Sequence, residues 1–229
     1  SNRVTYIQCD DEYDLLTKFL RAWQSGRYLP DVITGWNIEF FDIPYIVNRI
    51  TNVLGRHEAI KLSPWQILDE RTITQQGKDH KVYVPAGITV LDYMQLYKKF
   101  SFKNQESYKL DAIAHEELGV KKLDYSEYGS LHELYVNNFE RFIDYNIHDV
   151  TLIDMLEEKL KFIEQVIAFA YDARVNYIDT MTTVRPWDII IHNYLLDHAV
   201  VIPQFKKNSN YDTLVGGYVK EPKIGIRRK

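Results

Sequence analysis

The sequence predicts an α/β fold, in which short core strands alternate with amphipathic helices. Apolar, partly β-branched runs at 32–34 and 88–92 have the length and composition of core strands. Around them, apolar residues recur at helical spacing. Strands that alternate with helices along the chain are typical of a sheet with helices packed on its faces. We therefore expect a sheet with flanking helices.

The composition is that of an ordinary globular protein. Of the 229 residues, 45% are hydrophobic, which is enough to fill a core. No run approaches the roughly 18 apolar residues of a membrane span, so we expect no membrane partner. The single cysteine, Cys9, excludes an internal disulfide and a cysteine-based zinc site and fits a reducing compartment. The seven histidines are scattered, which argues against a histidine-rich metal site.

The first elements are expected to be a strand and a helix. Residues 3–8 alternate polar and apolar side chains, which predicts a strand. Residues 11–23 carry apolar side chains at helical spacing, with Asp10 or Asp11 as the N-cap. That helix should end near residues 25–26.

The turn after the 32–34 strand is the most informative stretch. Gly35 and Asn37 tolerate a sharp backbone reversal. Apolar residues then recur at helical spacing from Ile43 to Leu54, directly after Asp42. Asp42 is therefore expected near a helix N-terminus at the carboxyl end of a strand, where open α/β sheets bind ligands. Position alone also allows a simple N-cap role.

Residues 71–84 are expected to form a β-hairpin that projects from the body. Two β-prone runs, 71–74 and 81–84, flank a polar tip that contains Gly77. The strand at 88–92 then returns the chain to the sheet.

The later half is predicted to be mainly helical. A short amphipathic helix spans 109–118, and a long helical pattern, as one or two helices, runs from 131 to about 167. The long pattern contains Tyr145 and Asp149, which a helix puts on one face because they are four positions apart. An aromatic core residue beside a surface carboxylate is the simpler alternative.

The net charge of −4 is unevenly distributed. Residues 205–229 carry seven basic and two acidic side chains, a local charge of +5 that leaves −9 for the rest. A basic tail on an acidic body is either a phosphate-contacting strip or a solvated terminus.

Four motifs in order resemble those of a known enzyme family. They are Gly35-Trp36-Asn37-Ile38-Glu39, Phe41-Asp42-Ile43-Pro44-Tyr45-Ile46, Tyr145-Asn146-Ile147-x-Asp149 and Gly216-Gly217-Tyr218-Val219-Lys220-Glu221-Pro222. Together they are similar to family B replicative DNA polymerases, in particular those of T-even-type phages, whose DEDDy 3′–5′ exonuclease domain has an RNase H-like fold. The resemblance therefore implies a mixed sheet with flanking helices. The resemblance covers nearly the whole chain.

The resemblance implies a domain organisation and partners. Residues 1–165 would be most of the exonuclease domain, and 166–229 a helical and extended connection to the polymerase palm. The parent protein would be a DNA-directed DNA polymerase with proofreading, which binds primer-template and single-stranded DNA and, through other parts, a sliding clamp. It would act in the cytoplasm of the host cell.

The resemblance also assigns residues to roles. Two divalent metals, Mg²⁺ or Mn²⁺, would bind the scissile phosphate, held by Asp42 and Asp149, and Tyr145 would orient the attacking water. Lys122 would support the scissile phosphate, with Lys121 as the competing assignment and a solvated lysine pair as the alternative. The residues expected to contact DNA lie in the hairpin and the basic tail: Arg71, Lys78, Lys81, Gly216, Gly217, Tyr218 and Lys220.

One family motif is not convincingly matched. The family takes an aspartate and a glutamate from an Asp-x-Glu motif inside its first strand, whereas Asp10-Asp11-Glu12 follows the predicted strand and opens a helix. We expect a capping role there, because acidic residues are favoured at a helix N-terminus. The first strands and the first motif, like the palm's catalytic motif, are then expected to be absent, and the isolated fragment weakly active or inactive.

A non-catalytic alternative stays open. An RNase H-like scaffold that binds DNA or a protein partner would need no metal site. It predicts that Asp42 and Asp149 lie far apart.

Overall fold

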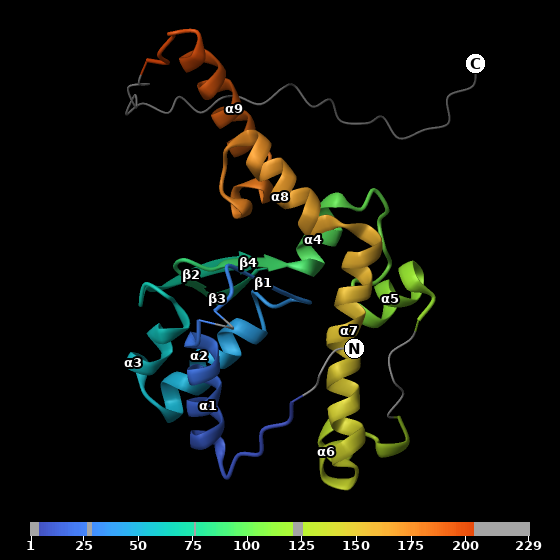
Figure 1. Cartoon of the computed structure of the whole chain (residues 1–229). Coiled ribbons are helices and arrows are strands. Elements are labelled where there is room, and N and C mark those ends of the chain that lie inside the picture. The colour runs from blue at the N-terminus through green and yellow to red at the C-terminus, as the bar shows by residue number, and fades with distance from the viewer. Residues whose placement is uncertain (1–4, 27–28, 76, 121–125, 204–229) are drawn as a thin grey trace, which may run out of the picture. The chain divides into compact units, whose positions relative to one another are not determined.

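The α/β class is present, as the sequence predicts, but the described residues form two separate two-stranded sheets, one parallel and one antiparallel, rather than one mixed sheet. The computed structural model describes residues 5–26, 29–75, 77–120 and 126–203 (Figure 1). In chain order its elements are α1 (Glu12–Gln24), β1 (Val32–Gly35), α2 (Asp42–Val53), α3 (Arg56–Ala59), η1 (Ile60–Leu62), β2 (Leu68–Gln75), β3 (Lys78–Pro85), β4 (Thr89–Asp92), α4 (Tyr93–Phe100), α5 (Leu110–Leu118), η2 (Ser126–Tyr128), α6 (Leu131–Asn137), α7 (Phe139–Leu160), α8 (Phe162–Ala173), η3 (Tyr177–Met181) and α9 (Val184–Asp197).

The chain divides into two units, residues 1–190 and 191–229. The first unit holds both sheets and the two clusters of buried apolar side chains. Of the second unit, the described part comprises the end of α9 and residues 198–203. None of the helices in the described ranges combines the length and the apolar character that crossing a membrane requires.

Strands β1 and β4 form a parallel pair (Figure 1). The register pairs Val32 with Thr89 at one end and Gly35 with Asp92 at the other. Because parallel strands end at the same edge, the turn that follows Gly35 begins directly beside Asp92.

Apolar clusters lie on both faces of this strand pair. Neighbouring residues of a strand point to opposite faces, and Val32 and Ile33 pack against different clusters. The Val32 cluster is built from β4, α4, α5, α7 and α8: its buried members are Leu91, Tyr93, Leu96, Tyr97, Leu110, Ile113, Ala114, Leu152, Leu156, Phe162 and Val166. The Ile33 cluster is built from α1, α2, α3 and η1: Leu16, Leu20, Ile43, Val47, Ile50, Ala59 and Leu62.

The predicted hairpin is confirmed as the antiparallel pair β2–β3. Two contacts connect it to the elements around the 35–42 turn. The Tyr83 hydroxyl donates a hydrogen bond to Asn48 Oδ1 of α2 at 3.2 Å. The His80 ring meets the Phe40 ring edge-on, with centroids 5.7 Å apart. The hairpin is therefore packed against α2 and the segment that leads into it, and does not project freely from the body as expected.

Several local predictions need correction. Residues 5–8 form no strand, because an alternating pattern becomes a strand only with a neighbouring strand to pair with, and no described strand pairs with it. The helical region from 131 onward is three helices, because the backbone turns at Asn138 and at Lys161, where φ is +59°. Helix α4 was not predicted, although its buried Tyr93, Leu96 and Tyr97 follow helical spacing.

Candidate functional site

Asp42 is the first residue of α2 and does not cap it. The N-cap position belongs to Phe41, whose side chain makes no capping hydrogen bond. The helix start is held by the backbone instead: the N–H of Phe41 donates to the Asn37 carbonyl and that of Ile43 to the Ile38 carbonyl, both at 3.0 Å. The simple capping interpretation is therefore wrong. The carboxylate of Asp42 lies exposed at the carboxyl end of β1.

Asp92, at the end of β4, connects the two strand ends. Its side chain is buried, with 5% exposed. Oδ1 accepts hydrogen bonds from the N–H groups of Met94 (3.0 Å) and Gln95 (3.4 Å) and so caps α4. It also accepts one from Asn37 at 3.2 Å, while Oδ2 accepts one from Glu39 at 3.2 Å. The sequence interpretation overlooked this residue, although an aspartate between a strand and a helical pattern is a recognised N-cap signal.

Three carboxyl groups therefore gather at one edge of the parallel pair. Burial raises the pKa of Asp92. Burial likewise raises the pKa of Glu39, and the Asp92 charge raises it further, while Arg71 of the hairpin lowers it. Although Asp42 reaches solvent, burial of part of its carboxyl group is the main cause of its raised pKa; its own backbone N–H lowers the pKa, and the Asp92 charge raises it. Ionised carboxylates at this edge therefore lower the stability of the folded chain.

Replacing Asp42 with asparagine is therefore expected to stabilise the metal-free chain at pH 7. A carboxyl pKa that is raised on folding means that the folded chain binds protons more tightly, so ionisation costs stability above the raised pKa. Since solvent screens this exposed group, we expect a gain below about 1 kcal/mol. As the pH falls toward the ordinary aspartate value of 3.8, native Asp42 becomes protonated and the gain should shrink. Urea unfolding of both chains in chelator at pH 7 and pH 4.5 checks this. A gain that grows at the lower pH would contradict it.

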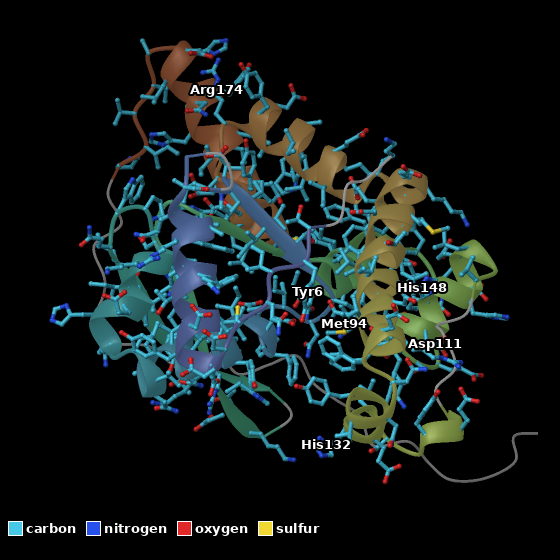
Figure 2. All side chains as sticks on the ribbon, turned by 60° about the horizontal axis from the view of Figure 1, so that its bottom comes forward. Tyr6, Met94, Asp111, His132, His148 and Arg174 are labelled. Atoms are coloured by element: carbon cyan, nitrogen blue, oxygen red, sulfur yellow. The ribbon has the colours of Figure 1, made fainter. Side chains whose placement is uncertain are left out.

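Tyr145 and Asp149 both lie on α7, as predicted. Both are partly buried, and Asp149 Oδ1 is shielded from solvent. Their four-residue spacing puts them on one side of the helix. Leu152 and Leu156, both fully buried, anchor the next turns of α7 in the core. Figure 2 labels the intervening His148 on α7 and Asp111 on the neighbouring helix α5. That Asp149 and Asp42 converge on one site stays a prediction.

The hairpin cations expected to contact DNA lie on different faces. Arg71 pairs with Val82 and Lys78 with Gln75, which puts both cations on the His80 face of the hairpin. Lys81 pairs with Thr72 on the opposite face, where its Nζ forms an ion pair with Glu70 at 2.6 Å. Of these three hairpin cations, Arg71 is the one whose charge lowers the pKa of Glu39.

The remaining predicted site residues lie outside the described residues. These are Lys122, with its competitor Lys121, and Gly216, Gly217, Tyr218 and Lys220. Their roles stay predictions.

The Asp10–Glu12 segment acts at the helix start, as expected. Asp11 is the N-cap of α1, and its Oδ1 accepts a hydrogen bond from the Asp14 N–H at 2.8 Å. Glu12 forms an ion pair with Arg49 of α2. These contacts give the segment a structural use.

The donor chemistry fits a divalent cation, but a full ligand set is not assembled. Within the described ranges, no three His, Cys, Asp or Glu side chains are grouped to hold a metal ion. Both Asp92 oxygens accept backbone N–H groups, which gives Asp92 a structural role at this edge. Asp42 and Asp149 offer the hard oxygen donors that Mg²⁺ and Mn²⁺ prefer.

Comparison with known proteins identifies the family. Residues 1–113 match DNA polymerase family B, exonuclease domain. The chain is 38% identical over 221 residues, 96% of its length, to the DNA-directed DNA polymerase of Escherichia phage RB69. It is 35% identical over 227 residues, 99% of its length, to that of Enterobacteria phage T4. The likeness extends to the DNA polymerase delta catalytic subunit of Glycine max, at 28% identity over 229 residues.

The chain spans only part of these relatives. It covers 24% of the RB69 polymerase and 25% of the T4 polymerase. The family match includes β1, the Asp42 turn, the hairpin and β4, whereas Tyr145 and Asp149 lie beyond it. The chain thus belongs to DNA polymerase family B and carries sequence of that family's exonuclease domain.

Proposed function

We propose that the chain is part of the proofreading 3′–5′ exonuclease of a DNA-directed DNA polymerase and has an RNase H-like fold. The main support is the exposed Asp42 carboxylate, which lies at the carboxyl end of a parallel strand in a segment that matches a polymerase exonuclease domain. Ligand sites of open α/β sheets lie at this edge. The substrate would be the 3′ end of primer DNA, in single-stranded form at the site.

Asp42 and Asp149 would hold two divalent metals, Mg²⁺ or Mn²⁺. Such metals lower the pKa of bound water and stabilise charge that develops on phosphate oxygens. Tyr145, one helical turn before Asp149, would orient the attacking water, and Lys122 would contact the scissile phosphate. The pKa of Asp42 is raised by burial and, to a smaller extent, by the Asp92 charge, and a bound cation would offset both effects.

The DNA contacts would be divided between the hairpin and the tail. Arg71 and Lys78 share one face of the hairpin, and the Arg71 charge lowers the pKa of Glu39, so this face would carry the strand entering the site. Lys81, paired with Glu70 on the opposite face, would contribute less. Gly216, Gly217, Tyr218 and Lys220 would contact template phosphates. A sliding clamp would bind other parts of the polymerase. The polymerase would act in the host cytoplasm.

Mn²⁺ binding tests the convergence on which this function depends. In the ¹⁵N-labelled chain, millimolar Mn²⁺ should broaden the amide signals near Asp42 and those near Asp149 at the same metal concentration. The Asp42→Asn and Asp149→Asn variants should each raise the Mn²⁺ concentration that broadens both groups of signals by about tenfold, because each removes a ligand of one shared site. Asp11→Asn, which alters an exposed carboxylate at the start of α1, is the matched control and should leave both unchanged.

Two outcomes would contradict the proposal. Broadening near Asp42 that is unaffected by Asp149→Asn would mean that the two carboxylates do not share a site. If the signals near both Asp42 and Asp149 stay sharp in Mn²⁺, the non-catalytic scaffold is favoured. Digestion of a 5′-labelled single-stranded oligonucleotide, measured alongside, should be lost in Asp42→Asn wherever the unchanged chain shows it.

A further inference from the structure

The Asp92 carboxylate binds two separate segments at once. Two of its hydrogen bonds go to the first turn of α4, through the N–H groups of Met94 and Gln95. The other two go back to Asn37 and Glu39, which precede it by 55 and 53 positions. Met94, the second residue of α4, is labelled in Figure 2. Asp92 thus joins the end of β4 to the turn that follows β1.

Capping a helix does not require the second pair of bonds. Asp11 shows what capping alone looks like in this chain: it is exposed, and its side chain accepts one hydrogen bond, from Asp14 of its own helix. Asp92 is buried and makes two bonds beyond those that its helix uses. Burying a carboxylate costs desolvation free energy unless it is well hydrogen-bonded. The hydrogen bonds to the turn offset this cost, which an exposed N-cap such as Asp11 does not have.

The turn that Asp92 holds determines where α2 begins. Asn37 has a φ of +63°, a left-handed conformation that asparagine adopts more readily than most non-glycine residues. The Asn37 carbonyl then accepts the Phe41 N–H, and the Ile38 carbonyl accepts the Ile43 N–H. The backbone from 37 to 43 is thus one hydrogen-bonded unit, with Asp42 at the first helical position. Fixing the N–H groups of Asn37 and Glu39 fixes the backbone that carries Asp42.

We propose that Asp92 is a positioning residue for the exonuclease site: its buried carboxylate holds the 37–39 turn so that Asp42 is presented at the sheet edge. The effect on metal binding rests on the proposed function, whereas the hydrogen bonds of Asp92 to the turn do not depend on it. Asp92 does not touch substrate or metal in this role. Its effect passes through the backbone of the turn.

Substitution with serine separates positioning from capping. Serine is a good N-cap, so Asp92→Ser should keep α4 capped, but its hydroxyl is too short to reach both segments. Asp92→Asn is a milder second variant, in which Oδ1 keeps its three donors and the amide nitrogen faces the Glu39 N–H, donor against donor. Asp11→Ser is the matched control at a cap that contacts no second segment.

Two measurements on the full chain test the proposal. Amide hydrogen exchange in metal-free buffer should become at least about tenfold faster at Asn37 and Glu39 in Asp92→Ser, and at Glu39 in Asp92→Asn, since each loses its buried acceptor. Exchange at Met94 should change little. In an Mn²⁺ titration, the concentration that half-broadens the Asp42 amide signal should rise at least about fivefold in Asp92→Ser. Asp11→Ser should change neither.

The outcomes distinguish this proposal from the proposed function. Exchange at Asn37 and Glu39 that stays as slow as in the unchanged chain would overturn the positioning role, with or without metal binding. Faster exchange with unchanged Mn²⁺ affinity would also overturn it, because Asp42 would then be presented without the turn contacts. If the unchanged chain binds no Mn²⁺ near Asp42, the proposed function fails, and the exchange measurement alone decides whether Asp92 holds the turn.

Discussion

Replacing Leu152 with alanine is expected to lower the free energy of unfolding by about 2–5 kcal/mol. Leu152 is fully buried in the cluster that also contains Leu91 of β4 and Leu96 of α4. Truncation removes apolar contacts and leaves a cavity that close-packed neighbours fill only in part. Because Leu152 follows Asp149 by three positions on α7, the same change should loosen the helix turn that carries Asp149 and Tyr145. Urea unfolding followed by circular dichroism measures the loss.

Val150→Ala is the matched control for this substitution. Val150 lies on the same helix but is 58% exposed. Its truncation creates no buried cavity, so we expect a change within about 0.5 kcal/mol. Equal losses for the two variants would mean that α7 is not anchored through Leu152. In that case the position of Asp149 would depend on other contacts.

Replacing Trp36 with alanine is expected to cost about 3–5 kcal/mol. Trp36 directly follows β1 and packs against the α4 side of the core, with its ring centroid 6.4 Å from those of Tyr93 and Tyr97. Its indole Nε1–H donates a hydrogen bond to the Tyr108 carbonyl at 3.0 Å. The substitution removes a large aromatic surface, the ring contacts and this hydrogen bond together. Equilibrium unfolding in urea gives the magnitude.

Trp36→Phe divides this cost between packing and hydrogen bonding. Phenylalanine keeps an aromatic ring but cannot donate to the Tyr108 carbonyl, so we expect a smaller loss, of about 1–2 kcal/mol. The amide signals of Asn37 and Glu39 should shift in both variants, because Trp36 leads directly into the turn. A loss in Trp36→Phe as large as that in Trp36→Ala would show that the ring contacts contribute little.

The elements that the sequence predicted well are those that depend on local patterns. Helices α1, α2 and α5, the β2–β3 hairpin and strands β1 and β4 all follow from side-chain spacing and turn residues within a few positions. Residues 5–8 show the limit of this reasoning. Their alternation is a strand pattern, yet a strand also needs a partner for its backbone groups, which local sequence does not specify.

Residues of the site were predictable to different degrees. Asp42 stood out because a glycine-containing turn and a helix start surround it, and Tyr145 and Asp149 because their spacing matches one helical face. The separation of Arg71 from Lys81 was not foreseen, because it depends on the strand register of the hairpin, in which Arg71 pairs with Val82 and Lys81 with Thr72.

By itself, the sequence determined the α/β class, the presence of an acidic residue where a strand gives way to a helix, and the polymerase family. Only the tertiary structure decided that Asp42 leaves its helix uncapped and that Asp92 holds the turn before it. The physical reason is the range of the interactions. Turn and helix signals act within a few residues, whereas the contacts of Asp92 join residues more than fifty positions apart and exist only because Gly35 and Asp92 are paired in the parallel register.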